Sequence, residues 1–571
     1  MNRAVVLVAL AACGDNAHPH DPGCDAWHQW GNNAAHSGDT CVSGQPLQQS
    51  FADIVFDPFV PQEALDTTGD LIVHYQVPLL DQDAVYMMQK GGTYTPCERK
   101  PATPPATGTV PDCFEPDELY RLDSQIWSEV RYSWHDGALA ADWQFDSDWT
   151  PEPGPFFEPM FQPVVVGSQI AIPGAGGTLW ELDAVTGKVL RHVQPPGFTA
   201  DTYVAGALAV DAGIIYYNAV ALDHDAPLTT PARAWLVAVA PDGGVRYADY
   251  ADLVGGAPRG ETCYGTFQID PDNPQPLPPP DNPDGTHVYP MKVACGPQVP
   301  GINTAPAFAA DGTVFVATHA QFDEEYSYLS AVNPGTMSAN WSASLRGLLY
   351  GGCGIDFACA NNAQTGVDPY TNMTPAAFVD DDSSSTPVAL PDGGVLYGAL
   401  DDVSLDRGHL LRFTDKGAYV TSYNFGWDST PALAGDEIII KDNNYISFTD
   451  RTDEDPGPYY ITALDSSLDP VWQFENTNTE SCTRAPDGSL TCVSDHPKGF
   501  EWCVNAPAVD ADGVVYANSE DGNLYAIAPD GTLRDKFFLD QSIGAAYTPV
   551  ALDHAGRIFA INNGHMMVVA N

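Results

Sequence analysis

Positive charge is scarce in this sequence: 23 Lys and Arg residues stand against 75 Asp and Glu, which gives a formal net charge of −52. A surface this negative repels phosphate backbones, so we expect no nucleic acid partner. The same charge disfavours binding to an anionic membrane through basic patches. We interpret the acidity as a source of solubility rather than as a sign of acid-specific chemistry.

Long hydrophobic runs are also missing. A membrane-spanning helix needs about 20 apolar residues, whereas the run near the start, residues 4–12 (AVVLVALAA) behind Arg3, has nine. This length and position fit the apolar region of a secretory signal, so we predict a signal peptide at residues 1–12. The polar residues 14–22, with two prolines, are typical of a flexible tether.

The residues at the end of the apolar run, "LAAC" (Leu10–Cys13), resemble the lipobox of bacterial lipoproteins. The resemblance implies that Cys13 is acylated and becomes the first residue of the mature chain. The chain would then be exported and anchored to the cell envelope through lipid only, at the outer membrane on its periplasmic or surface side. Two alternatives are an ordinary signal peptide and a chance apolar start with a free cysteine.

Several catalytic motifs are absent. The sequence contains no CxxC, no CxxCH for covalent haem, no GxSxG, no HExxH and no P-loop, and its 14 His residues show no metal-ligand spacing. We therefore predict no catalytic residue, no metal ligand and no cofactor-binding residue from motifs. A hydrolase or lyase that uses acidic loop residues is conceivable, but no specific pattern supports one.

The twelve cysteines fall into clusters once Cys13 is set aside. In an exported chain, cysteines that are close together in loops are typical of disulfides. The remaining eleven are an odd number, so one of the last three is expected to be unpaired. We predict the pairs Cys97–Cys113, Cys263–Cys295, Cys353–Cys359 and Cys24–Cys41, and Cys482 paired with either Cys492 or Cys503.

One phrase recurs eight times: a Pro-Ala or Pro-Val pair in most copies, then a Gly or Asp turn, then a β-branched and an aromatic residue, as in "APAFAADGTVFVA" from Ala305. Each copy predicts two short strands around a tight turn. Most copies are followed by a second hairpin phrase, such as "LYAIAPDGTLRDKF" from Leu524. Two hairpins make one four-stranded blade, so the sequence predicts an all-β, eight-bladed β-propeller of antiparallel blades.

The phrases "LYAIAPDGTL" and "LWELDAVTGKVL" resemble the repeat of the PQQ-like (quinoprotein-like) propellers, and Trp27–Gly38 resembles the segment that often precedes their first blade. Trp143, Trp341 and Trp472 match the final Trp of the repeat, and we expect them to pack between blades. We predict a tether and pre-propeller segment at 13–50 and a single propeller domain at 51–571. The predicted blades of this domain are residues 78–148, 159–194, 203–250, 304–345, 383–426, 428–477, 505–540 and 546–571.

The last copy ends after three strands, so one strand is missing. We expect an N-terminal strand to close the ring, and we assign this role to Gly69–Gln76 (GDLIVHYQ), paired with Met566–Ala570. In this arrangement Leu71, Val73 and Tyr75 would be buried, and the alternate residues would be more exposed.

The long insertions follow second and fourth strands, and both kinds of connection emerge on one face of a propeller. We therefore expect a loop-rich face, crosslinked by disulfides, opposite a face of short turns. This arrangement favours a non-enzymatic module that binds an envelope protein or a polysaccharide. It is similar to the propeller lipoprotein of outer-membrane protein assembly, whose blades share the repeat.

The alternative is a PQQ- and Ca²⁺-dependent quinoprotein oxidoreductase. The resemblance implies a cofactor pocket at the centre of the funnel, with a vicinal cysteine pair beside the quinone and Glu, Asn and Asp around Ca²⁺. The sequence has no adjacent cysteines, and no such acidic set can be placed by motif. We therefore expect no cofactor.

Overall fold

The computed structural model describes the chain from residue 26 to its last residue, with gaps between the described segments. The described residues are 26–67, 73–101, 109–112, 121–153, 158–223, 231–259, 262–264, 282–286, 288, 292–350, 352–354, 358–362, 376–379, 385–401, 407–425, 429–443, 457–485, 487–502, 504–541 and 548–571.

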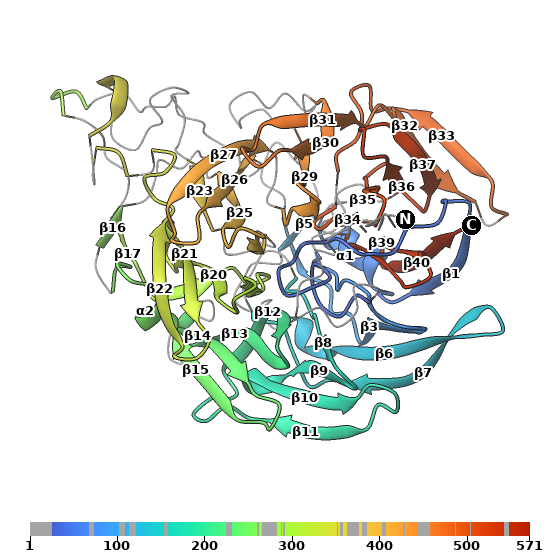
Figure 1. Ribbon diagram of the computed structural model, residues 1–571, viewed down its shortest axis with the longest axis horizontal. Helices are drawn as coiled ribbons and strands as arrows, with labels where there is room; N and C mark the ends of the chain where they lie inside the picture. Colours follow the sequence, from blue (N-terminus) through green and yellow to red (C-terminus); the bar gives the residue numbers. More distant parts are fainter. Residues whose placement is uncertain are drawn as a thin grey trace, which may run out of the picture.

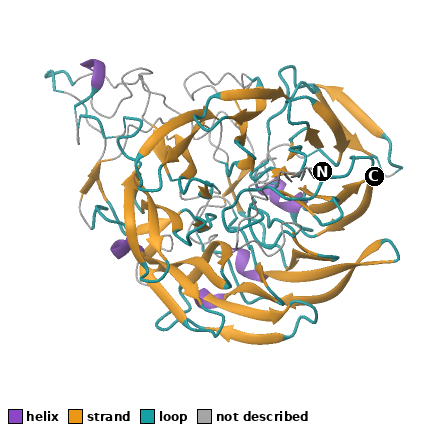
Figure 2. Cartoon of the chain, in the orientation of Figure 1, coloured by secondary structure: helices purple, strands orange, loops and turns teal. Residues whose placement is uncertain are grey.

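Eight antiparallel sheets surround a common centre, and the chain passes from one to the next around the ring (Figures 1 and 2). Each is a four-stranded blade in meander order, with the innermost strand divided into two segments in two of the blades, which confirms the predicted eight-bladed propeller. The apolar side chains of adjacent blades pack against each other and form the core. The innermost strand β8 is short and mostly buried, whereas the outer strand β11 is mostly exposed or half-buried.

The first four blades contain these strands: β2 (Leu79–Asp81), β3 (Ala84–Gly92), β6 (Gln125–His135) and β7 (Ala138–Asp146); β8 (Val164–Val166), β9 (Gln169–Gly174), β10 (Thr178–Asp183) and β11 (Val189–Val193); β12 (Thr202–Asp211), β13 (Ile214–Leu222), β14 (Pro231–Val239) and β15 (Val245–Asp249); β18 (Gln298–Pro300) with β19 (Ala307–Phe308), β20 (Val314–Ala320), β21 (Asp323–Asn333) and β22 (Ser338–Ser344).

The last four blades contain these strands: β23 (Ala376–Phe378) with β24 (Val388–Ala389), β25 (Val395–Asp401), β26 (Arg407–Phe413) and β27 (Tyr419–Phe425); β28 (Ala432–Ala434), β29 (Glu437–Asn443), β30 (Tyr459–Leu464) and β31 (Pro470–Glu475); β34 (Ala508–Val509), β35 (Val515–Asn518), β36 (Asn523–Ile527) and β37 (Leu533–Phe538); β38 (Val550–Leu552), β39 (Ile558–Asn562), β40 (His565–Ala570) and β1 (Gln49–Val55).

Three further hairpins and a few short helices lie in the connections between and within blades. The described helices are α1 (Val60–Asp66), α2 (Tyr250–Leu253), η1 (Arg121–Ser124), η2 (Ala175–Gly177) and η3 (Ala360–Asn362). Among the described residues, none of the helices has the length and apolar character needed to cross a membrane. The hairpins are β4 (Glu98–Pro101) with β5 (Thr109–Asp112), β16 (Thr262–Tyr264) with β17 (Lys292–Ala294), and β32 (Glu480–Arg484) with β33 (Leu490–Ser494).

The ring is closed by an N-terminal strand, as predicted, but the strand is β1 and not Gly69–Gln76. β1 pairs antiparallel with β40, from Gln49 opposite Ala570 to Val55 opposite His565. The assignment to Gly69–Gln76 was wrong because its described residues are buried on both sides. His74 and Gln76, expected to be more exposed, are 2% and 0% exposed. An outer strand has one partner and faces solvent, so β1 carries polar residues and lacks the apolar alternation that we sought.

Residues 26–45, which we call the collar, run around the axis on the short-turn face, opposite the face with the long loops. The inner strands have no sheet partner toward the axis, so the collar bonds backbone groups that would otherwise be unpaired. The collar reaches the eight blades in chain order, through bonds of 2.7–2.9 Å between Trp27 and Leu80, His28 and Val165, Gln29 and Val210, Ala34 and Phe308, Ala35 and Ala389, Ser37 and Leu433, Gly38 and Val509, and Gln45 and Gly556.

The collar depends on specific residues of the Trp27–Gly38 phrase. Trp27 and Trp30 are each 1% exposed. Gly38 has φ +68°, and a Cβ there would lie 2.8 Å from the Cβ of Ala432, so a side chain would clash with blade six. The pre-propeller segment is therefore an integral part of the ring.

The three repeat tryptophans pack between blades, as expected. Trp143 lies against Gly187 of the next blade, where an added Cβ would come within 2.7 Å of the indole ring. Its Nε1 donates to the Ala184 carbonyl oxygen at 3.2 Å. Trp341 and Trp472 contact Gly417 and Gly531 of their next blades in the same way. The glycine of each turn therefore makes room for the ring of the preceding blade.

Many acidic residues belong to the short turns. An Asp side chain there accepts a hydrogen bond from the backbone N–H two residues later, which stabilises a tight turn. Part of the negative charge is therefore built into the hairpins, in addition to its effect on solubility. The pairs are Asp242–Gly244, Asp311–Thr313, Asp392–Gly394, Asp530–Thr532 and Asp553–Ala555, with N···O distances of 2.9–3.1 Å.

Candidate functional site

A buried charged cluster lies at the loop-side end of β3. The Lys90 ammonium group is 2.9 Å from Asp57 Oδ2, 2.9 Å from Glu63 Oε1 and 2.7 Å from Glu158 Oε1. All four side chains are at most 8% exposed. Asp57 follows β1, Glu63 lies on α1 and Glu158 precedes β8. One lysine therefore joins the closing strand, a helix and the first two blades.

Burial dominates the electrostatics of this cluster. It raises the pKa of Glu63 to about 8, and the charges of Asp57 and Glu158 act in the same direction against the opposing effect of Lys90. Burial alone would lower the pKa of Lys90, but the three carboxyl groups outweigh it and hold the pKa well above its ordinary value. Glu63 Oε2 has no hydrogen-bond partner among the described residues, so this oxygen can carry a proton at neutral pH.

The cluster adjoins the axis of the ring. His74 Nδ1 is 3.3 Å from the Glu158 carbonyl oxygen. Its pKa falls to about 3, first because it is buried and also because Lys441 of blade six, three blades away around the ring, is near. The segment that enters β2 therefore lies at the centre on the loop side. The sequence motifs did not reveal this cluster. The one signal that could have indicated it is Lys90 itself, a charged residue near the end of an otherwise mostly apolar strand.

We tested whether this centre fits Ca²⁺ and PQQ, which the repeat implies. The carboxylates already surround an ammonium group, and a Ca²⁺ ion would place a second cation beside Lys90. Lys90 is already enclosed by three carboxyl groups, so it is not available to pair with the carboxylates of PQQ. Among the described residues, no group of three or more His, Cys, Asp and Glu is arranged to hold a metal ion. The described centre does not fit these groups.

The long insertions carry the crosslinks. The structure contains the disulfides Cys263–Cys295, Cys353–Cys359 and Cys482–Cys492, so Cys492 is the partner of Cys482. Cys41 and Cys97 are also disulfide-bonded. The remaining cysteines singled out from the sequence, Cys13, Cys24, Cys113 and Cys503, lie outside the described residues.

A Ser–His–Asp group lies on the β32–β33 hairpin, but its geometry does not suit nucleophilic catalysis. Ser481 Oγ lies 2.7 Å from Asp495 Oδ1 and 3.2 Å from His496 Nδ1. The same Asp495 oxygen is 2.7 Å from the same His496 nitrogen. A catalytic histidine must use one nitrogen for the serine and the other for the acid. Here both contacts share Nδ1, so the group is a hairpin contact.

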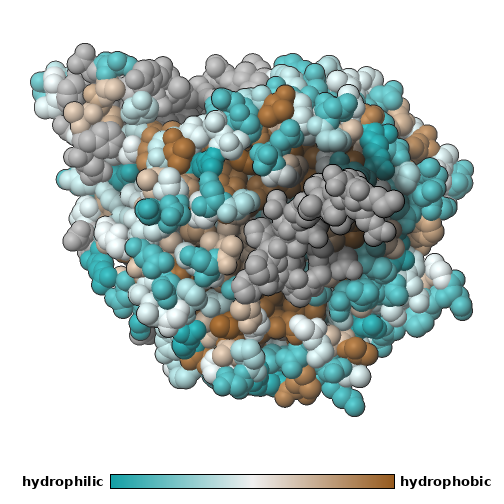
Figure 3. All heavy atoms as spheres, viewed as in Figure 1, coloured by the Kyte–Doolittle hydropathy of each residue, from teal (hydrophilic) through white to brown (hydrophobic). Residues whose placement is uncertain are grey.

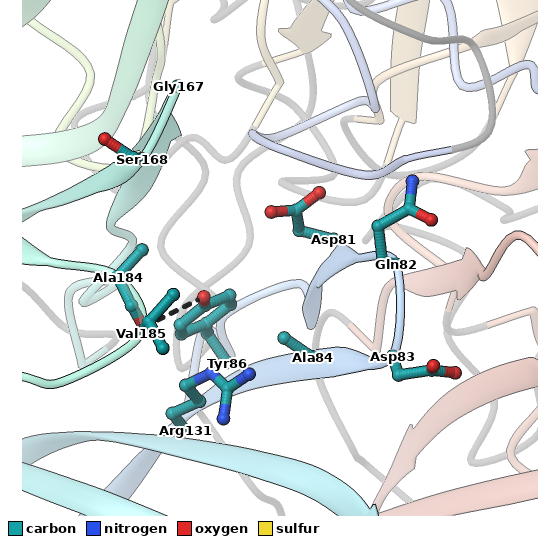
Figure 4. Close-up of a pocket in the computed structure, with 10 residues that line it drawn as sticks. All are labelled: Asp81, Gln82, Asp83, Ala84, Tyr86, Arg131, Gly167, Ser168, Ala184 and Val185. Carbon is teal, nitrogen blue, oxygen red and sulfur yellow. Dashed lines mark hydrogen bonds between the residues drawn. The ribbon is translucent and has the colours of Figure 1, made fainter.

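A cleft of about 440 Å³ lies between blades one and two on the short-turn face. Figure 4 shows Asp81 and Asp83 on one side, Ser168 on the other and Arg131 below, with a hydrogen bond of 3.1 Å from the Tyr86 hydroxyl to the Ala184 carbonyl oxygen. Its charged groups already have partners within the chain: Arg131 pairs with Asp142, and Asp81 lies 3.4 Å from His28. We therefore assign this cleft to blade packing.

One face of the molecule is visible as a surface in Figure 3. The described residues there are mostly hydrophilic or intermediate, and hydrophobic residues form small separate patches. A partner that binds to the face drawn in Figure 3 would therefore contact polar groups rather than one large apolar area.

Comparison with solved structures supports the architecture. The quinohemoprotein alcohol dehydrogenase from Comamonas testosteroni matches 94% of this chain and 76% of its own, at 11% identity and a TM-score of 0.50. A europium-containing methanol dehydrogenase matches 94% of this chain and 89% of its own, at 12% identity and a TM-score of 0.49. BamB from Moraxella catarrhalis matches 77% and 88%, at 12% identity and a TM-score of 0.33.

No protein-family model matches the sequence, and no curated protein matches it. The structural similarity at 11% identity shows a shared fold. In its fold the chain is therefore an eight-bladed β-propeller.

Proposed function

We propose that this chain is a non-enzymatic, exported lipoprotein that binds a protein or polysaccharide partner in the cell envelope through its loop-rich face. One observation carries the proposal. The described disulfides with both partners, Cys263–Cys295, Cys353–Cys359 and Cys482–Cys492, all lie in insertions that follow fourth strands. These connections emerge on the face opposite the collar, so all three of these disulfides lie on the loop-rich side of the propeller.

The charged cluster supports a structural rather than catalytic centre. Lys90 has three N–H groups, and each of its three carboxyl partners lies within 2.9 Å. A lysine held in this way is not available as a base or a nucleophile. The cluster instead fixes the loop-side end of β3 to the closing strand, which keeps the loop-rich face in one arrangement.

The binding proposal is tested with a photo-crosslinking residue at single positions in the full-length protein. Leu490, 44% exposed on β33, lies on the loop-rich face, and Val185, 65% exposed between β10 and β11, is the matched control on the short-turn face. We expect adducts with envelope protein or glycan from Leu490 and none from Val185. Adducts from Val185 alone, or equal adducts from both, would contradict the proposal.

The lipid anchor is tested separately by the mass of the mature N-terminus, which should be an acylated Cys13. A chain that begins elsewhere or lacks the acyl mass would overturn this part. About 0.8 kcal/mol per buried CH₂ holds such an anchor in the bilayer, so Cys13→Ala should release the protein from membranes.

The fold of the Comamonas testosteroni dehydrogenase favours one alternative, a quinoprotein oxidoreductase that uses PQQ and Ca²⁺. Absorption spectra of the purified protein with added PQQ and Ca²⁺ distinguish the two. We expect no bound quinone after gel filtration. Stoichiometric retention of PQQ, together with reduction of a dye by an alcohol, would favour the oxidoreductase.

A further inference from the structure

The collar fixes the side on which the N-terminal part of the chain leaves the propeller. Trp27 and Leu80 exchange two backbone hydrogen bonds, each 2.8 Å long, at the turn end of the innermost strand of blade one. The next residue, His28, lies 3.4 Å from Asp81 in the first turn of that blade. The described chain therefore begins, at residue 26, on the short-turn face and close to blade one.

We infer that the short-turn face is the attachment side of this protein, and that the anchored propeller holds its loop-rich face away from the bilayer, toward a partner that is not in the same membrane plane. This inference rests on the proposed lipid anchor at Cys13. It excludes one partner for the loop-rich face, which is the anchoring lipid surface itself.

The tether is too short to allow easily the opposite orientation, in which the loop-rich face would lie on the bilayer. Twelve residues lie between Cys13 and Ala26, and the thirteen Cα–Cα steps span about 45 Å when fully extended and about 20 Å as a flexible coil. To place the loop-rich face on the bilayer, the tether would cross a four-stranded blade, about 14 Å, and then follow a strand as long as β20, about 23 Å. This path of roughly 37 Å is nearly twice the coil dimension.

The disulfide of the collar restricts this reach further. Cys41 is disulfide-bonded and follows Thr40, whose N–H donates to the Val509 carbonyl oxygen at 2.9 Å on the short-turn face. With Cys24 as the predicted partner, ten residues lie between Cys13 and Cys24, and the eleven Cα–Cα steps span about 37 Å when fully extended. The inverted orientation would then require complete extension of the tether.

The collar is strong enough to act as a fixed point. It bonds to all eight blades, and its own residues Trp27 and Trp30 are almost fully buried. Pulling it away would leave eight inner strands with unpaired backbone groups, each of which costs about 1–3 kcal/mol when buried. The chain therefore cannot shift its exit point to the other face without unfolding the ring.

Energy transfer to the membrane tests the orientation in the full-length protein. A fluorophore is introduced through a non-natural residue at Leu65, 68% exposed on α1 on the loop-rich side, or at Val185, 65% exposed on the short-turn side. Both positions lie near the first two blades. The vesicles consist of phosphatidylcholine, a fraction of which carries an acceptor fluorophore on the headgroup. Because this lipid has no net charge, repulsion between the acidic turns and the membrane does not affect the orientation.

We expect transfer from Val185 to exceed transfer from Leu65 several-fold, because the two lie on opposite faces. Equal transfer from both positions, or greater transfer from Leu65, would overturn the inference. A second preparation carries a histidine tag in place of residues 1–12 and binds to nickel-chelating lipid. If the native chain does not float with vesicles, the proposed lipid anchor fails, whereas the tagged chain still decides the orientation through the same two labels.

Discussion

The raised pKa of Glu63 leads to a prediction about alkaline stability. Glu63→Gln has the shape of the protonated acid, and its carbonyl oxygen can still accept the hydrogen bond that Lys90 donates to Glu63 Oε1 at 2.9 Å. The substitution therefore keeps the contact with Lys90 and removes only the ability to ionise. If Glu63 is protonated in the folded protein, the variant should match the parent at low pH and exceed it in stability at high pH.

The size of the effect follows from the pKa shift. Burial raises the pKa of Glu63 from 4.5 to about 8, so between these values the folded protein binds a proton that the unfolded chain releases. Stability is therefore fully present below pH 4.5 and is lost as pH rises toward 8. At about 1.4 kcal/mol per pKa unit, the total loss is up to roughly 5 kcal/mol. Glu63→Gln should not show this loss.

Urea unfolding of parent and variant, measured with the disulfides intact from pH 4.5 to pH 9, tests this prediction. The difference in unfolding free energy should be near zero at pH 4.5, grow with pH and level off above pH 8. Glu475→Gln, an exposed glutamate on β31, is the matched control and should give a small difference at every pH. A difference for Glu63→Gln that does not change with pH, or a variant that is less stable at pH 9, would refute the reasoning.

Three further predictions concern the ring. Lys90→Met should lower the unfolding free energy by about 3–5 kcal/mol in urea titrations, because it leaves buried carboxylates without their cation; a neutral result would contradict the cluster. Consecutive N–H groups of β1 point to opposite sides, so Asp53→Pro combined with Ile54→Pro must remove one hydrogen bond to β40. We expect this double variant to have a lower Tm and to self-associate in gel filtration. An unchanged monomer would contradict the role of β1. His36, whose pKa burial lowers to about 4, stabilises the collar above pH 6.5, and about 3 kcal/mol should be lost as pH falls to 4. His36→Gln should flatten this loss in thermal scans, and an equally steep acid transition in the variant would count against it.

The sequence by itself determined the repeat, and with it the class of fold. A hairpin signal depends on a turn and the few residues on each side, so eight copies of one phrase were sufficient to predict eight blades. The local disulfides Cys263–Cys295 and Cys353–Cys359 followed for the same reason, because their partners are close in the chain. The repeat count also required an N-terminal strand to complete the last blade.

The tertiary structure alone decided which strand closes the ring. β1 is an edge strand with exposed residues such as Phe51, so burial gives it little alternating pattern. Gly69–Gln76 has the stronger pattern, yet its described part is buried at the axis. Pairing with β40 depends on a position about 500 residues away, and no local signal can specify it.

The same reason explains the charged cluster and the collar. Asp57 and Glu63 lie far in sequence from Glu158, and only the closed ring brings all three carboxyl groups within 3 Å of the Lys90 ammonium nitrogen. The collar contacts each successive blade in turn, so its path exists only after all eight blades are in place. Local sequence specifies hairpins, whereas contacts that converge on an axis depend on the order and number of blades around it.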